Sequence, residues 1–109
     1  MDGKFLGKIT FAEFGTVRHY PFFMGLQLQF SFDGCGIGCG GKYTENMSKS
    51  CKWEYPEKRQ ITITEKIDML YEILKQAKVN YVSQLVGKPV EITIVNNTFS
   101  DFRILTEVL

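Results

Sequence analysis

The chain has 109 residues, of which 44% are hydrophobic and 23% are charged, and its formal net charge is +1. This length accommodates one hydrophobic core, and this composition argues against both a wholly disordered chain and a membrane-spanning one. A charge so close to neutral argues against a strongly basic nucleic-acid binder and against an acidic mimic of DNA. We therefore expect a single domain that covers residues 1–109.

The N-terminal third is expected to contain two strands. Residues from Phe5 to Phe14 are rich in β-forming and aromatic side chains, which predicts the first strand. Residues 16–23 contain Pro21, which disfavours a central strand, so we expect a connection there. From Met24 to Phe32 apolar and polar residues alternate strictly, which predicts a strand with five apolar side chains on one face.

The next segment, residues 34–55, has low hydrophobicity and carries five glycines between positions 34 and 41. A connection of this length is uncommon in a compact domain unless it has a function or contains structure of its own. We therefore expect a glycine-rich excursion with functional contacts or internal β structure. It is the leading candidate for a functional surface.

A helix is expected after this excursion. The sequence Thr62-Ile63-Thr64-Glu65 has the pattern of a capping box, and apolar residues recur at helical spacing from Ile63 to at least Ala77. Pro56 followed by Glu57 is the alternative signal and would place the start earlier.

The C-terminal part predicts a short helical turn and a hairpin. Val82–Val86 forms the turn, which Gly87 ends. Residues 90–95 alternate between apolar and polar side chains, and Asn96-Asn97 is suited to a tight turn into a last strand at 98–108. The fold class is therefore α+β, with an antiparallel β-sheet of about four strands, including this C-terminal hairpin, packed against one main α-helix.

The glycine-rich stretch at 36–41, GIGCGG, matches the phosphate-binding pattern G-x-G-x-x-G. That pattern requires a helix directly afterwards, so that backbone amides at the helix N-terminus meet the phosphate. Residues 42–48 lack helical periodicity, and a turned or flexible loop is the favoured interpretation.

The candidate metal ligands are three cysteines and the single histidine: Cys35, Cys39, Cys51 and His19. Thiolates at such spacing suit zinc or an iron–sulfur cluster, but a fourth ligand near the cysteines is missing. Three reduced thiols are therefore favoured over a metal site, and His19 is the sole imidazole that could activate a cysteine. We assign no cofactor and no catalytic residue, and we expect the protein not to be an enzyme.

Cations and aromatic rings alternate around the end of the excursion. Such a surface could form a protein-binding hot spot, or stack the bases and contact the phosphates of a single-stranded nucleic acid. The expected partner-binding residues are Tyr43, Lys49, Lys52, Trp53, Tyr55, Lys58 and Arg59.

Two stretches resemble a family of small uncharacterised phage and prophage proteins. They are residues 8–28, which begin KITF and end GLQL, and residues 85–109, which contain LVGKPVEIT and end FRILTEVL. The resemblance carries no activity or site residue, but it implies a setting inside an infected bacterium.

Location and function follow from these observations as expectations. The N-terminus lacks the features of a secretion signal and the cysteine count is odd, so we expect a cytoplasmic protein. The resemblance implies that this is the cytoplasm of a bacterial host cell. The first hypothesis is a non-enzymatic phage accessory protein that binds a protein partner of the host or phage. By analogy with other small phage proteins, this partner could be a host defence nuclease of the CRISPR type. The alternatives are a single-stranded nucleic-acid-binding accessory protein and a small zinc-binding module; the oligomeric state stays open.

Overall fold

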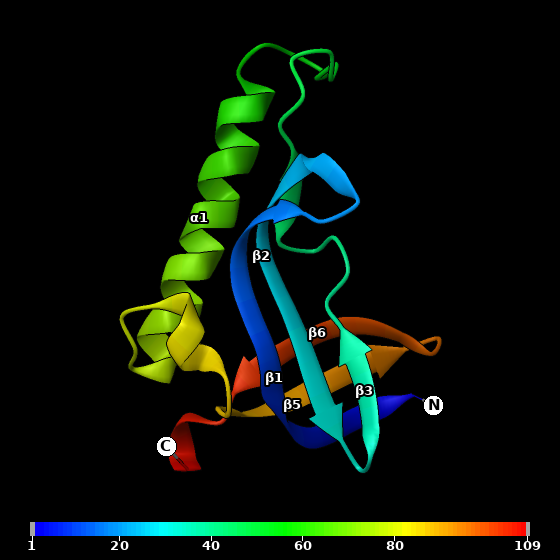
Figure 1. Ribbon diagram of the computed structural model, residues 1–109, viewed down its shortest axis with the longest axis vertical. Helices are drawn as coiled ribbons and strands as arrows, with labels where there is room; N and C mark the ends of the chain where they lie inside the picture. The colour runs from blue at the N-terminus through cyan, green and yellow to red at the C-terminus, as the bar shows by residue number, and fades with distance from the viewer. Residues whose placement is uncertain (1, 109) are drawn as a thin grey trace.

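The computed structural model describes residues 2–108, which form six strands, one long helix and two short 3-10 helices (Figure 1). The expected α+β class, an antiparallel sheet with one main helix, is confirmed. The sheet has six strands where about four were expected, because the internal β structure that was one expectation for residues 34–55 is present as two short strands. The elements are β1 (Gly3–Val17), β2 (Tyr20–Phe32), β3 (Cys35–Gly38), β4 (Thr44–Asn46), α1 (Lys58–Ala77), η1 (Val82–Leu85), β5 (Pro89–Val95), β6 (Thr98–Ile104) and η2 (Thr106–Val108).

The sheet has the strand order β3-β2-β1-β5-β6. The remaining strand, β4, also pairs with β2, at residues 23–25, whereas β3 pairs with residues 29–32. The first strand, β1, is shared: residues 3–8 pair with β5 and residues 8–17 pair with β2. A bulge between Ile9 and Phe11 marks the change of partner. At Gly7 an added Cβ would lie 2.2 Å from the backbone oxygen of Ser31, so only glycine fits where β1 turns between its partners.

The sheet curls until its two ends approach each other. The Phe30 ring of β2 lies 5.4 Å from the Phe99 ring and 5.0 Å from the Phe102 ring of β6, although β1 and β5 separate these strands in the sheet. We call the place where the two ends of the sheet approach each other the seam. Across the seam, Lys42 Nζ donates a hydrogen bond of 2.9 Å to the Ser100 backbone oxygen. The long first strand is thus shared by two groups of strands, and the helix lies in the chain before the last hairpin.

The expected strand at 24–32 is confirmed, but the expected connection at 16–23 is wrong. The strands β1 and β2 are joined by a turn at Arg18 and His19. The pairing with β1 then jumps from Val17↔Tyr20 to Thr16↔Met24. Pro21 lies in this irregularity, where its missing N–H removes no regular ladder bond.

The helix and the C-terminal elements agree with most expectations. The helix covers Ile63 to Ala77 and begins earlier, at Lys58, as the alternative signal at Pro56-Glu57 indicated. The capping-box interpretation is wrong, because Thr62 and Glu65 lie inside the helix. The turn at η1 is confirmed. The hairpin turn is also confirmed, and its Asn96 and Asn97 have φ of 54° and 59°. The last strand was expected at 98–108 but ends at Ile104.

Candidate functional site

The predicted partner-binding residues separate into one core residue and a group at one end of the molecule. Tyr43 is only 5% exposed and its ring meets Phe102 edge-on at 6.2 Å, so it lies in the core, where it also lines the apolar groove described below. Four residues of the group at the end of the molecule are exposed: Lys49, Lys52, Tyr55 and Arg59. Trp53 and Lys58 are half-buried.

The loop that carries these residues lies beside the β1–β2 hairpin. The Met47 N–H donates a hydrogen bond of 2.7 Å to the Phe22 oxygen, which ties the start of the loop to the hairpin. Both segments therefore lie at the same end of the molecule, next to the N-terminus of α1 (Figure 1). We call residues 17–24 and 46–62 the basic aromatic end.

The hairpin contributes aromatic rings that the sequence interpretation did not assign to a site. Tyr20 is 58% exposed and Phe22 is 44% exposed. Their rings meet edge-on at 6.2 Å, and Phe22 contacts Phe23 at 4.9 Å. The signal was present in Tyr20-Pro21-Phe22-Phe23 next to Arg18 and His19, but the proline had directed these residues to a connection.

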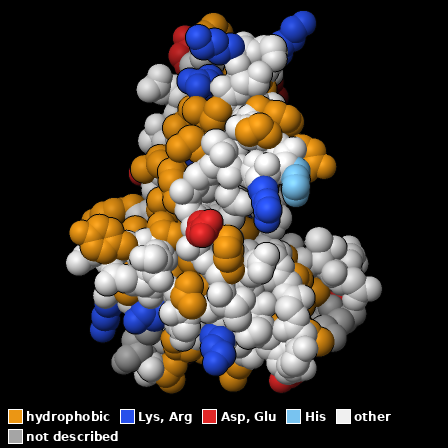
Figure 2. All heavy atoms as spheres, in the orientation of Figure 1, with side chains coloured by type: hydrophobic (Ala, Val, Ile, Leu, Met, Phe, Trp, Pro, Cys, Tyr) orange, Lys and Arg blue, Asp and Glu red, His pale blue; other side chains and the backbone are white. Residues whose placement is uncertain are grey.

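The charge of the molecule is unevenly distributed. The basic aromatic end carries five lysine and arginine residues against two glutamates, whereas the rest of the chain carries eight cations against ten carboxylates. Lysine and arginine side chains are visible at this extremity, above a region of hydrophobic side chains on α1 and the hairpin (Figure 2). A nearly neutral protein therefore presents one positively charged end.

Below this end an apolar groove lies between α1, the β1–β2 hairpin and the residues around β4. Its volume is about 120 Å³, and the charged residues in its lining are Glu45 and Lys66. Large hydrophobic side chains at the groove are exposed, with Phe14 at 42%, Met24 at 39% and Ile67 at 48%. Exposed apolar side chains that adjoin an apolar recess are typical of an interaction surface.

The groove exists because the N-terminal half of α1 is incompletely covered. The two buried residues of this helix, Ile73 and Ala77, both lie in its last two turns. Ile63 and Leu70 are half-buried and line the groove. The helix is held to the excursion by Lys66, whose Nζ donates a hydrogen bond of 2.5 Å to the Lys42 oxygen.

The three cysteines and His19 do not form a shared metal site among the described residues. His19 and Cys35 flank opposite ends of β2, a strand of 13 residues that is roughly 40 Å long at 3.3 Å per residue. Cys39 is buried, where its Sγ accepts the Leu28 N–H at 3.4 Å, and Cys51 lies in the loop at 47–57. Within residues 2–108 no three His, Cys, Asp or Glu side chains are placed to share a metal ion. The glycine pattern at 36–41 belongs to β3 and the turn after it, and the next helix begins only at Lys58.

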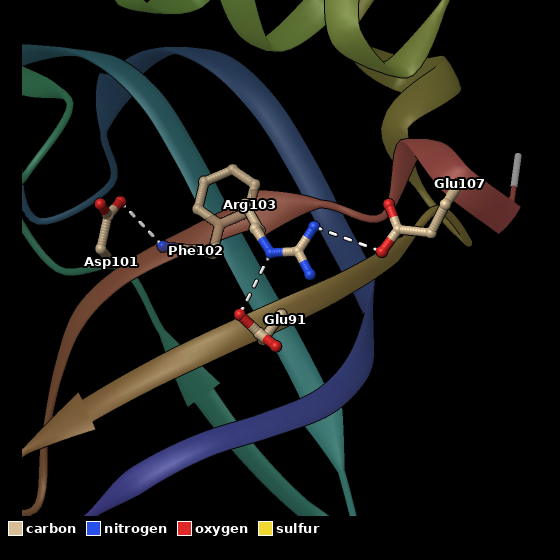
Figure 3. A network of polar contacts seen from close by, with 5 residues as sticks. All are labelled: Glu91, Asp101, Phe102, Arg103 and Glu107. Atoms are coloured by element: carbon tan, nitrogen blue, oxygen red, sulfur yellow. Dashed lines mark hydrogen bonds and ion pairs between the residues drawn. The ribbon is translucent and has the colours of Figure 1, made fainter.

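A cluster of charged side chains lies among the C-terminal elements (Figure 3). Arg103 Nε lies 3.1 Å from a Glu91 oxygen, and its Nη1 lies 3.3 Å from a Glu107 oxygen. The hydrogen bond to Glu91 raises the pKa of Arg103. This exposed network links β5, β6 and η2, and exposed ion pairs of this kind contribute little to stability.

Two buried groups next to the seam make stability sensitive to alkali. Burial raises the pKa of the Tyr43 phenol and of the Cys39 thiol. Each group therefore stays protonated in the folded state at a pH where the unfolded chain releases its proton, so stability falls as the pH rises. We expect the denaturant concentration at the unfolding midpoint to decrease as the pH is raised from about 9 to about 11. In the double variant Tyr43→Phe with Cys39→Ala, we expect this decrease to be smaller. The same slope in the variant would contradict the assignment.

Comparisons with known proteins identify no relative. No protein-family model matches the chain, and no curated protein or solved structure gives a significant match. Among the described residues no helix is both long and apolar enough to span a bilayer.

Proposed function

We propose that this protein is a non-enzymatic accessory protein that acts by binding another protein. The observation that carries the proposal is the apolar groove, which is bounded by exposed Phe14, Met24 and Ile67. Exposed aromatic and aliphatic side chains around a recess are the usual centre of a protein interface, where a few residues supply most of the binding free energy. The basic aromatic end adjoins the groove and extends the contact surface.

The biological setting is part of the proposal. The resemblance to phage and prophage proteins suggests a partner inside an infected bacterium, from either the phage or its host. A defence nuclease of the CRISPR type is one such partner. The proposed mechanism is occupation of a surface of that partner, with no bond made or broken.

A site-specific crosslinking experiment tests the proposal. The photoreactive residue p-benzoylphenylalanine replaces Ile67 at the groove, or Leu6 as a control, because Leu6 is also an exposed hydrophobic residue but lies in the half of β1 that pairs with β5. After irradiation of bacterial cells that express each variant, we expect a discrete protein adduct from position 67 and none from position 6. Adducts of equal yield at both positions, or none at position 67, would contradict the proposal.

A second candidate function is binding of single-stranded nucleic acid at the basic aromatic end. It is favoured by five cations beside exposed Tyr20, Phe22 and Tyr55, a combination that contacts phosphates and stacks bases. The strand connectivity resembles that of an OB-type barrel, a fold in which the loop between the first two strands contributes to oligonucleotide binding. The crosslinking experiment separates the two candidates, since an adduct at position 67 that nuclease removes would favour nucleic acid.

A further inference from the structure

We infer that the apolar groove is an anchor pocket for one large apolar side chain of a partner segment that also carries acidic residues. The inference rests on the proposed function and specifies the chemistry of the partner. Its three supports are the volume of the groove, the nature of its lining and the charge of the surface above it.

The volume of the groove is on the scale of one apolar side chain. A cavity of about 150 Å³ lined by apolar side chains accommodates a benzene molecule, and the groove has about 120 Å³. Sites for drug-sized molecules and cofactors measure roughly 300–1,000 Å³. The groove therefore suits a phenyl ring or a branched aliphatic side chain.

The lining supplies affinity for an apolar group. Ile63 and Leu70 of α1 face the hairpin residues Met24 and Leu26 across the groove. Filling it would remove water from apolar surface on both partners, which contributes about 25 cal/mol per Å². A side chain that enters such a recess is the usual anchor of an interface.

The charges near the groove specify what flanks the anchor. Glu45 and Lys66 both line the groove and offset each other, and the described residues place no carboxylate in ion-pair contact with Lys66. The preference therefore comes from the basic aromatic end, with its five cations against two glutamates. Acidic residues on the side of the anchor that faces this end would meet complementary charge.

A library of short peptides of random sequence, displayed on yeast and selected against the 109-residue chain, tests the inference. We expect the enriched peptides to share one Phe, Leu, Ile or Met with Asp or Glu nearby. A synthetic peptide of the enriched sequence is then titrated while the fluorescence of Trp53, the single tryptophan of the chain, is followed. Basic or purely polar enriched peptides, or no enrichment, would overturn the inference.

Matched variants locate the site on the protein. Ile67→Lys places a charge at the groove and is expected to weaken the peptide at least about tenfold, which is about 1.4 kcal/mol. Leu6→Lys makes the same change at another exposed position and is expected to leave affinity unchanged. Lys52→Glu, at the basic aromatic end, is expected to weaken the peptide and to reduce the dependence of its affinity on salt. Equal affinity of the Ile67→Lys and Leu6→Lys variants would overturn the assignment to the groove.

The inference and the proposed function fail in different ways. A protein adduct at position 67 together with basic or polar enriched peptides would overturn the anchor and leave protein binding in place. An oligonucleotide that binds at low salt and displaces the selected peptide would count against the acidic partner and for nucleic acid at this end.

Discussion

Replacing Phe30 by alanine is expected to lower the free energy of unfolding by about 3–5 kcal/mol, the cost typical of deleting a buried phenyl ring. Phe30 is only 1% exposed and lies at the centre of the curled sheet. Its ring stacks on Phe99 and contacts Phe102, both from β6. The substitution therefore leaves a cavity and also removes the aromatic contact that joins the two ends of the sheet. Equilibrium denaturation in urea, followed by circular dichroism, measures the effect.

Phe22→Ala is the matched control, since it deletes the same ring at a position that is 44% exposed. Phe22 contacts only the neighbouring rings of Tyr20 and Phe23 among the described aromatic pairs. We expect it to cost less than about 1 kcal/mol, as for surface positions in general. If both variants lost equal stability, the curled sheet with Phe30 at its centre would be wrong.

Local patterns were sufficient to predict the main helix, residues 24–32 of β2 and the C-terminal hairpin. Strict alternation from Met24 to Phe32 gave the strand and its buried face, and Leu26, Leu28, Phe30 and Phe32 are indeed buried. Met24 follows the same alternation but is 39% exposed, because the sheet is incompletely covered beside the groove. Paired asparagines at 96 and 97 identified the hairpin turn, because asparagine tolerates the positive φ that such a turn requires.

Features that depend on contacts between distant segments were missed. The strands β3 and β4 are four and three residues long, too short for an alternating pattern, and they exist only because β2 offers them an edge. Tyr43 was assigned to the contact surface because it belongs to the run in which cations alternate with aromatic rings, whereas the curled sheet places its ring against Phe102. The groove could not be predicted, because it requires the hairpin, β4 and α1 to meet. The hairpin rings were not assigned to the site because Pro21 favoured a connection at residues 16–23.

Replacing Gly25 by alanine is the second large expected effect, and it connects stability to the candidate site. Gly25 has a φ of 153°, which side chains rarely adopt, and an added Cβ would lie 2.1 Å from the Tyr43 oxygen and 2.7 Å from the Thr44 Cα. Backbone strain and overpacking each cost about 1–3 kcal/mol, so we expect the free energy of unfolding in urea denaturation to fall by about 2–6 kcal/mol. The chain would relax by moving Tyr43 and β4 away from β2, which weakens the hydrogen bond from the Leu26 N–H to the Tyr43 oxygen.

Gly15→Ala provides the control, because Gly15 lies directly opposite Gly25 in the pairing of β1 with β2. An added Cβ there meets no atom within 4 Å, and its φ lies outside the positive range. We expect this change to be neutral or to stabilise by up to about 1 kcal/mol, since alanine restricts the unfolded chain more than glycine does. Because Gly25 lines the groove and Gly15 does not, only Gly25→Ala should also weaken an apolar peptide under conditions where both variants are folded. Equal peptide affinity in the two folded variants would mean that the groove does not depend on the close approach of β4 to β2.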